Sequence, residues 1–432
     1  MKTREPYYTT IGKLNAAGRE QIPPELLSST QLIYSSPATL AFNSPGATGF
    51  GVKRAGLAIP GSVMLLVAPG CCGRNTKLLS EVKGYEDRFF FLLMDESDIV
   101  NGDHLSKVPQ AVEEIVEYLD AMDKHPSMVM LCGTCVDALL GTDWDRVCRR
   151  AEERVGLPVR TSYMYALTRE GRKPPMVLVR QTLYSLLEPA KRNSRTVNLL
   201  GYFSPLIDDS ELYDVLRQIG IRTINELSRC EDYESYLAMS KANFNLVLDA
   251  EARTAADDME KRLQIPYIEL PRLYQPDKIR RQYEILAKTL GAEVELNVYE
   301  EETLEQIRRF RERFGAITVA IGEMMNANAF ELALMLIRQG FAVSEIFCNI
   351  TSEDYLHIRH LAKLSPDTKV YTNLSPTMLY YDIGSGEADL TIGKDAAHYY
   401  PERPNVAWNE DRQPYGFAGV RKLFTQMEAA YE

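Results

Sequence analysis

One unit recurs along most of the chain: a short apolar run rich in β-branched residues, a turn that contains glycine, and a segment with helical spacing of apolar residues. Apolar runs of this kind, bounded by turn residues, indicate buried strands. Strands that alternate with helices predict parallel sheets covered by helices on both faces. The predicted strands span residues 62–68, 88–94, 127–131, 196–202, 243–248, 316–322, 342–349 and 388–393, and the clearest predicted helices span 108–122 and begin at about Val136.

The length of 432 residues is too great for one ordinary core, so two or three domains are expected. A polar, basic, turn-prone segment at 188–195 precedes a new predicted strand, and a second seam lies near 291–303. We therefore predict an α/β protein of three doubly wound, Rossmann-like lobes with parallel sheets. The N-terminal lobe is residues 1–190, the second is 191–295, and the third is 296–432 with a closing C-terminal helix.

The bulk composition is that of a soluble globular protein, with 45% apolar and 25% charged residues. No apolar run approaches the length needed to span a bilayer, and the N-terminus lacks the apolar core of a signal peptide. A cytoplasmic protein without a membrane partner is expected. The net charge of −11 argues against nucleic acid as a partner, because phosphate binding favours a basic face.

Two cysteine pairs stand at predicted strand-to-helix turns beside glycine, where backbone can approach an inorganic centre. Cys71 and Cys72 lie in A-P-G-C-C-G, and Cys132 and Cys135 form C-G-T-C. Thiolates in electropositive turns have a lowered pKa and bind metal well. The predicted N-terminal lobe therefore carries candidate metal ligands at the carboxyl ends of two strands, where doubly wound sheets bind ligands. The remaining cysteines in apolar patterns are predicted to be small buried residues, namely Cys148, Cys230 and Cys348.

The pairs alone leave zinc, a thiol redox couple and an iron–sulfur cluster open. Structural zinc favours two C-x-x-C knuckles, whereas adjacent side chains such as Cys71 and Cys72 point apart in extended backbone. A thioredoxin-like couple would use Cys132 and Cys135 and leave the first pair unexplained. The chain has no phosphate-binding P-loop motif, so we expect it to hydrolyse no nucleotide itself.

In their order and spacing, six segments resemble the nitrogenase component 1 family, which includes the molybdenum–iron protein. The resemblance covers about residues 35–425 and places Cys72 and Cys135 in cluster-ligand positions. The segments are V-A-P-G-C-C-G (67–73), M-D-E-S-D-I-V-N-G-D (94–103), C-G-T-C-V-D-A-L-L-G-T-D (132–143), S-K-A-N-F-N-L-V (240–247), M-E-K-R-L-Q-I-P-Y (259–267) and Y-G-F-A-G-V (415–420).

The departures from the family pattern limit the function that the resemblance implies. The family's first cluster cysteine would fall at Phe42 or Asn43, its cofactor cysteine near Val247, and its cofactor histidine near Ala407. The chain thus resembles a nitrogenase-like reductase subunit rather than a true nitrogenase, and no molybdenum cofactor is expected.

The resemblance implies an iron–sulfur cluster, of the four-iron four-sulfur type, ligated by Cys72 and Cys135 of each of two chains. The second chain would be a copy or a different component 1-type chain, because two-fold interfaces are the commonest. Cys71 and Cys132 would then support the ligands or tune the cluster. The alternative is that both pairs of one chain supply all four ligands.

By the same resemblance, a separate ATP-dependent iron protein would deliver electrons to the cluster. The cluster would pass them to a substrate or cofactor in a crevice between lobes. The candidate residues that would line this crevice follow the end of a predicted strand, and they are Gly322, Glu323, Asn326 and Asn328. Their alternative role is to form the polar start of a helix. Two further functions stay open, a non-catalytic scaffold for metallocofactor assembly and a thiol or zinc protein on the same fold.

Overall fold

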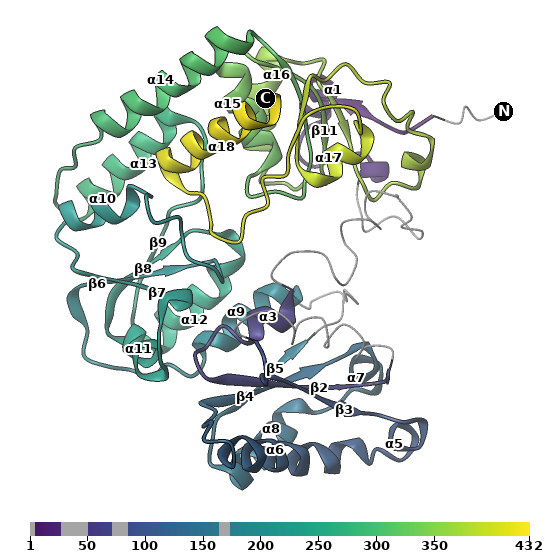
Figure 1. The fold of residues 1–432 in the computed structure, drawn as a ribbon, viewed down its shortest axis with the longest axis vertical. Coiled ribbons are helices and arrows are strands. Elements are labelled where there is room, and N and C mark those ends of the chain that lie inside the picture. The colour runs from purple at the N-terminus through teal and green to yellow at the C-terminus, as the bar shows by residue number, and fades with distance from the viewer. Residues whose placement is uncertain (1–4, 27–50, 71–84, 164–172) are drawn as a thin grey trace. The chain divides into compact units, whose positions relative to one another are not determined.

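The computed structural model describes residues 5–26, 51–70, 85–163 and 173–432, and Figure 1 shows their arrangement into helices and strands. The described strands form three sheets, and all of their pairings are parallel except that of β1 with β12. The predicted α/β class with parallel sheets is confirmed.

The contacts divide the chain into two compact units, one of Met1–Ala47, Leu206–Ile219 and Arg272–Glu432, the other of Thr48–Pro205 and Gly220–Pro271. The three predicted lobe ranges, 1–190, 191–295 and 296–432, stay predictions.

The first sheet has the order β3-β2-β4-β5, so the predicted strands 62–68 and 127–131 pair in one sheet. Its strands are β2 (Ser62–Ala68), β3 (Phe89–Leu93), β4 (Met128–Gly133) and β5 (Val159–Tyr163). The associated helices are α3 (Val52–Gly56), α5 (Glu96–Asn101), α6 (His104–Asp120), α7 (Cys135–Leu140), α8 (Trp144–Val155) and α9 (Pro175–Tyr184).

Strand β2 is buried on both faces, which explains its continuous apolar sequence. Val63, Leu65 and Val67 belong to one apolar cluster with residues of α6 and α8. The alternate residues of the strand, such as Leu66, belong to a second cluster with residues of α3 and α9. Figure 1 shows these two helix pairs on opposite sides of the sheet.

The second sheet has the order β7-β6-β8-β9. Two buried asparagines, Asn198 and Asn245, interrupt its apolar strands, and their side chains bond to each other. Asn198 Nδ2 donates to Asn245 Oδ1 at 2.8 Å and to the Met239 carbonyl at 3.0 Å. The strands are β6 (Asn193–Leu200), β7 (Thr223–Glu226), β8 (Ala242–Val247) and β9 (Tyr267–Glu269), and the helices are α11 (Tyr233–Leu237) and α12 (Arg253–Leu263).

The third sheet has the order β1-β12-β11-β10-β13-β14. Its strands are β1 (Thr9–Thr10), β10 (Thr318–Ile321), β11 (Ala342–Phe347), β12 (Lys369–Tyr371), β13 (Leu390–Ile392) and β14 (Asn405–Val406). The helices of this unit are α1 (Ile11–Ala17), α10 (Leu212–Gln218), α13 (Pro276–Thr289), α14 (Asn297–Phe314), α15 (Ala329–Arg338), α16 (Tyr355–Leu364), α17 (Lys394–Tyr399) and the closing helix α18 (Gly416–Tyr431). Short 3-10 turns cover Pro24–Leu26, Leu227–Arg229, Ala238–Lys241, Ala250–Ala252 and Pro376–Tyr380.

Each sheet has one point at which the strand order reverses. In the first sheet it lies between β2 and β4, in the second between β6 and β8, and in the third between β10 and β13. Ligands of doubly wound folds bind outside the carboxyl ends of the strands at such points. The order of the strands therefore defines three edges at which to look for a site. None of the helices in the described part of the chain has the length and apolarity to cross a bilayer.

Candidate functional site

The first edge lies at the carboxyl ends of β2 and β4, which are neighbouring strands with Leu66 opposite Cys132. Gly70 follows the end of β2 closely, and Cys135 begins helix α7 just after β4. Cys71 and Cys72 lie outside the described residues. The approach of Cys72 to Cys135 therefore stays a prediction, which the adjacency of their two strands supports.

The loop that carries Cys135 is held by its own polar side chains. Thr134 and Asp137 form a capping box at the start of α7, with the Thr134 backbone N–H donating to Asp137 Oδ2 at 2.9 Å. Thr142 Oγ1 donates to the other oxygen of the same carboxylate at 3.3 Å. Gly141 ends the helix at φ 68°, a left-handed backbone that favours glycine. The motif thereby leaves the Cys135 thiol exposed at the edge of the sheet.

Cys132 lies in a different environment from Cys135. Its side chain is fully buried in an apolar cluster that includes Leu66 and Leu183. The next residue, Gly133, is packed so closely that an added Cβ would lie 2.9 Å from Trp144 Nε1. Cys132 thus contributes to the packing of this core, and its predicted role as a metal ligand stays a prediction.

Within the described ranges, no three His, Cys, Asp or Glu side chains come together in a way that could hold a metal ion. The exposed Cys135 is compatible with a cluster whose other ligands come from Cys72 and from a second chain. Cys148 and Cys348 are buried as predicted, and Cys230 is half-buried. Burial raises the pKa of the Cys148 thiol to about 12, which makes it a poor thiolate ligand.

The second edge, between β6 and β8, carries no thiol at the position where the resemblance would place one. Val247 ends β8 and is buried. Gly201 follows β6 at φ 136°, and an added Cβ would lie 2.8 Å from both the backbone nitrogen and the Cβ of Asp249. The segment that follows β6 and the segment that follows β8 are therefore in close contact at this edge. Ala407, the position corresponding to the family histidine, follows the short strand β14 and likewise offers no ligand atom.

The third edge, between β10 and β13, joins two carboxylates. Gly322 follows β10, and a Cβ there would lie 2.1 Å from Asp395 Oδ1, so only glycine admits the Asp395 side chain. Asp395 Oδ2 accepts the Glu323 backbone N–H and the Asn373 side-chain amide, both at 2.7 Å. The Glu323 carboxylate in turn accepts the Asn349 side-chain amide at 3.0 Å. The ends of β10, β11, β12 and β13 thus meet in one hydrogen-bond network.

The Glu323 carboxyl group can exchange a proton near neutral pH. Burial is the largest cause and the Asp395 charge the next, and together they raise the pKa of Glu323 to about 7. Burial also raises the pKa of Asp395. Carboxyl groups with such shifts at a strand-end edge are candidates for proton transfer.

The other two predicted lining residues hold the loop after β10. Asn326 is buried, its Oδ1 accepts the Glu410 backbone N–H at 2.5 Å, and its Nδ2 donates to Gln413 Oε1 at 3.1 Å. Asn328 is the N-cap of α15, with Oδ1 accepting two backbone N–H groups at 3.0 Å. Asn328 therefore starts a helix, and its predicted role in lining a substrate site stays a prediction. Sequence reasoning missed Asp395, Asn349 and Asn373. Each lies two or three residues after the end of a strand, and that position is the signal that would have found them.

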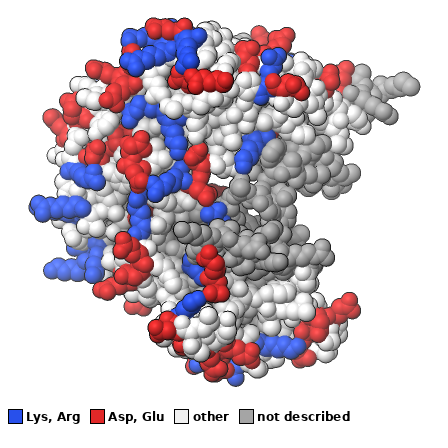
Figure 2. All heavy atoms as spheres, viewed as in Figure 1, with Lys and Arg blue, Asp and Glu red and all other residues white. Residues whose placement is uncertain are grey.

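Charged side chains of both signs are interspersed on the face shown in Figure 2 rather than gathered by sign. This arrangement gives no sign of a basic stripe on the described part of that face, which is the feature that nucleic-acid binding favours.

Comparison with known proteins agrees with the fold. The profile of the nitrogenase component 1 type oxidoreductases matches residues 48–431. The nitrogenase iron-molybdenum cofactor biosynthesis protein NifE of Sinorhizobium fredii is 24% identical over 357 residues, which cover 78% of this chain and 70% of that protein. The protein of the same name from Clostridium pasteurianum is 26% identical over 244 residues, covering 55% of this chain and 52% of that protein.

Among solved structures, nitrogenase Cp1 at pH 6.5 has a TM-score of 0.68 at 16% identity and covers 96% of both chains. This likeness shows the fold alone. Because the family profile spans most of the chain, the chain belongs to the family of nitrogenase component 1 type oxidoreductases.

Proposed function

We propose that this chain is a scaffold on which an iron–sulfur-based metallocofactor is assembled and then passed on. The observation that carries the proposal is the contrast between the edges of the three sheets. The first edge presents an exposed thiol, Cys135, whereas the described positions near Val247 and Ala407 present no thiol or imidazole. The similarity to proteins named for iron-molybdenum cofactor biosynthesis supports a scaffold over a catalyst.

Cys72 and Cys135 would hold the iron–sulfur cluster, with the same two positions of a second component 1-type chain completing the ligand set. When bound, such a cluster supplies one-electron transfer and bridging sulfides. The chain's own part is to keep Cys135 exposed. Asp137 does this by accepting the Thr134 N–H and the Thr142 hydroxyl, which ties both ends of the loop to one carboxylate.

A reductase subunit is the second candidate, and the third edge favours it. The Glu323 carboxyl group is half-buried at this edge, and burial together with the Asp395 charge raises its pKa to about 7, so Glu323 can hold a proton that a reduction consumes. In this proposal an ATP-dependent iron protein supplies the electrons and a substrate lies beside Glu323.

The test starts with protein purified without oxygen and with iron, sulfide and zinc analysis. We expect a reducible iron–sulfur signal by electron paramagnetic resonance that Cys135→Ala removes and Cys230→Ala, the matched half-buried control, leaves intact. Zinc without iron would point to the thiol or zinc alternative and contradict the proposal.

A second measurement separates the scaffold from the reductase. Protein that carries the iron–sulfur cluster is mixed in one experiment with an iron protein and ATP. In a separate experiment it is mixed with a cofactor-free acceptor from the same family. If iron and sulfide pass to the acceptor, and pass equally well from the Glu323→Gln variant, the result supports the scaffold. Oxidation of the cluster coupled to product formation, and abolished by Glu323→Gln, supports the reductase.

A further inference from the structure

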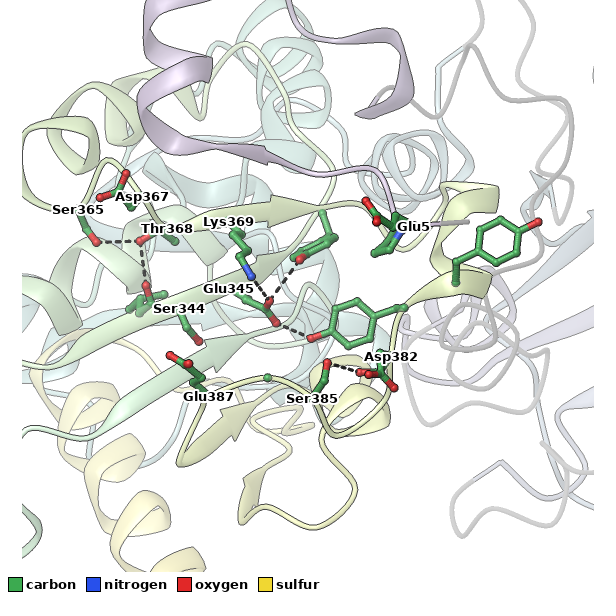
Figure 3. Close-up of a pocket in the computed structure, with 16 residues that line it drawn as sticks. Glu5, Ser344, Glu345, Ser365, Asp367, Thr368, Lys369, Asp382, Ser385 and Glu387 are labelled. Atoms are coloured by element: carbon green, nitrogen blue, oxygen red, sulfur yellow. Dashed lines mark hydrogen bonds and ion pairs between the residues drawn. The ribbon is translucent and has the colours of Figure 1, made fainter. Parts of the chain in front are cut away.

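A cavity of about 680 Å³ opens on the third sheet, and its position differs from the strand-end edges discussed above. Its walls come from the first residues of β11, the start of β12, the loop between β12 and β13, and the segment before β1. Figure 3 shows the labelled side chains spread along the cavity, with Lys369 beside the Glu345 carboxylate. The volume lies within the range of about 300–1,000 Å³ that is usual for small-molecule sites.

The ionisable side chains of the cavity are almost all acidic. The cavity is lined by one amine, that of Lys369, and by five carboxylates from Glu5, Glu345, Asp367, Asp382 and Glu387. All but Glu345 are exposed at the rim. A cavity with this excess of carboxylates attracts cations and repels anions.

Glu345 is the buried member of the set, with a side chain only 5% exposed. Its Oε2 accepts short hydrogen bonds from the Tyr381 and Tyr400 hydroxyls, both at 2.6 Å. Its Oε1 accepts only the Tyr371 hydroxyl at 3.3 Å among the described residues. One oxygen of a buried carboxylate therefore keeps acceptor capacity on the side of the cavity.

Lys369 shows what kind of group this wall accommodates. Its Nζ lies 3.6 Å from Glu345 Oε1, beyond hydrogen-bond distance, and 5.5 Å from the centre of the Tyr8 ring. A carboxylate and an aromatic face are the usual partners of an ammonium group. Because the Lys369 side chain is 47% exposed, its amine can move into solvent and leave the place beside Glu345 to another ammonium.

We propose that this cavity binds a linear polyamine, with one ammonium at Glu345 Oε1 and the others at the rim carboxylates. A polyamine carries only donors, and the acidic groups of the cavity offer only acceptors. A metal ion fits less well, because the described residues contain no cluster of three suitable ligands and the carboxylates are spread along the cavity. The proposal is independent of the proposed scaffold function.

The test is isothermal titration of the full chain with spermidine at a fixed salt concentration of about 0.15 M. We expect Glu345→Gln to weaken binding by about tenfold or more, since it removes a buried charge partner. The rim double variant Asp367→Asn with Glu387→Gln keeps the tyrosine contacts and is expected to weaken binding by roughly threefold. The control Glu312→Gln removes an exposed charge of α14 in the same unit and is expected to change nothing.

Several outcomes would overturn the proposal. One is equal spermidine affinity in the wild type and in the rim double variant, which shows that binding is diffuse attraction to the net charge. Another is displacement of spermidine by magnesium at equal concentration, which shows a site for a metal. Absence of spermidine binding to the wild type at millimolar concentration would also end it. If Glu345→Gln melts below the wild type, the rim variant decides the outcome alone.

Discussion

Replacing Gly416 by alanine should destabilise the C-terminal unit far more than an ordinary glycine replacement. Helix α18 begins at Gly416, and its first N–H groups are not capped by the N-cap residue Tyr415. The cap comes instead from Glu211, far away in sequence. The Glu211 carboxylate accepts the Phe417 N–H at 2.7 Å and the Ala418 N–H at 3.0 Å.

The magnitude follows from two local effects. Gly416 has φ 65°, and a left-handed conformation costs a non-glycine residue about 1–2 kcal/mol. An added Cβ would also lie 1.8 Å from Glu211 Oε1 and 2.5 Å from the Tyr283 hydroxyl, so the carboxylate must move. Each hydrogen bond to a charged acceptor contributes about 1.5–3 kcal/mol, and losing one of the two caps brings the expected total to about 3–5 kcal/mol.

Tryptophan fluorescence can report the unfolding of the C-terminal unit, and a second glycine variant can serve as the control. Of its two tryptophans, Trp408 lies in the same unit as α18 and Trp144 in the other, so a Trp144→Phe background makes urea-induced fluorescence changes specific to the C-terminal unit. Gly291 of the same unit has φ 72° with nothing within 4 Å of an added Cβ, so Gly291→Ala measures the backbone cost alone. Equal losses of unfolding free energy in Gly291→Ala and Gly416→Ala would refute the argument from the Glu211 cap.

Three further predictions concern pH, the iron site and a helix cap. Burial raises the pKa of Glu331 to about 7, above the value of about 4.5 in an unfolded chain. The stability that this shift contributes is present below pH 4.5 and is lost as the pH rises through 7. Glu331→Gln should therefore reduce the fall of the unfolding free energy between pH 5 and 8 by roughly 3 kcal/mol. Cys135→Ala should abolish bound iron, measured by metal analysis, whereas Cys148→Ala should retain it. Asn328→Ala should lower the unfolding free energy by about 1 kcal/mol in urea titrations, because α15 loses its N-cap.

The buried central strands were predictable because their burial on both faces imposes a continuous apolar run. The expected strand at 62–68 coincides with β2, and the expected strand at 127–131 is β4, Met128–Gly133. The missed strands are short or only partly buried. In β5, Val159–Tyr163, two of the five residues are buried, and β1 is a two-residue strand held by antiparallel pairing with the distant β12. No local pattern encodes such a pairing.

Helix α6 shows a second limit of local patterns. The apolar spacing predicted a helix at 108–122, but the helix spans His104–Asp120 and contains Pro109. Pro109 is the sixth residue of this helix, where proline removes one intrahelical hydrogen bond and crowds the carbonyl four residues earlier, so the helical turn before it is not indicated by the local pattern.

The candidate site was predictable only in part, because its geometry depends on contacts between distant strand ends. Glu323 was found from its place after a predicted strand, but its partner Asp395 approaches only because Gly322 leaves room for it. A glycine directly after a buried strand, followed by an acidic residue, was the local sign of that approach. The raised pKa of Glu323 depends first on burial, which the sequence around it does not specify.

The distribution of chemistry over the three edges bears most directly on function, since a fold shared with a family does not by itself carry the family's activity. The strand orders that create the edges are intact, and so is the loop that exposes Cys135. The second edge ends in the buried Val247 and the third in a carboxyl pair, Glu323 and Asp395. The second edge offers no thiol or imidazole at Val247, and the thiol of the third edge, Cys348, is buried. The missing thiol and imidazole at Val247 and Ala407 support the scaffold proposal, whereas the carboxyl groups of the third edge support the reductase.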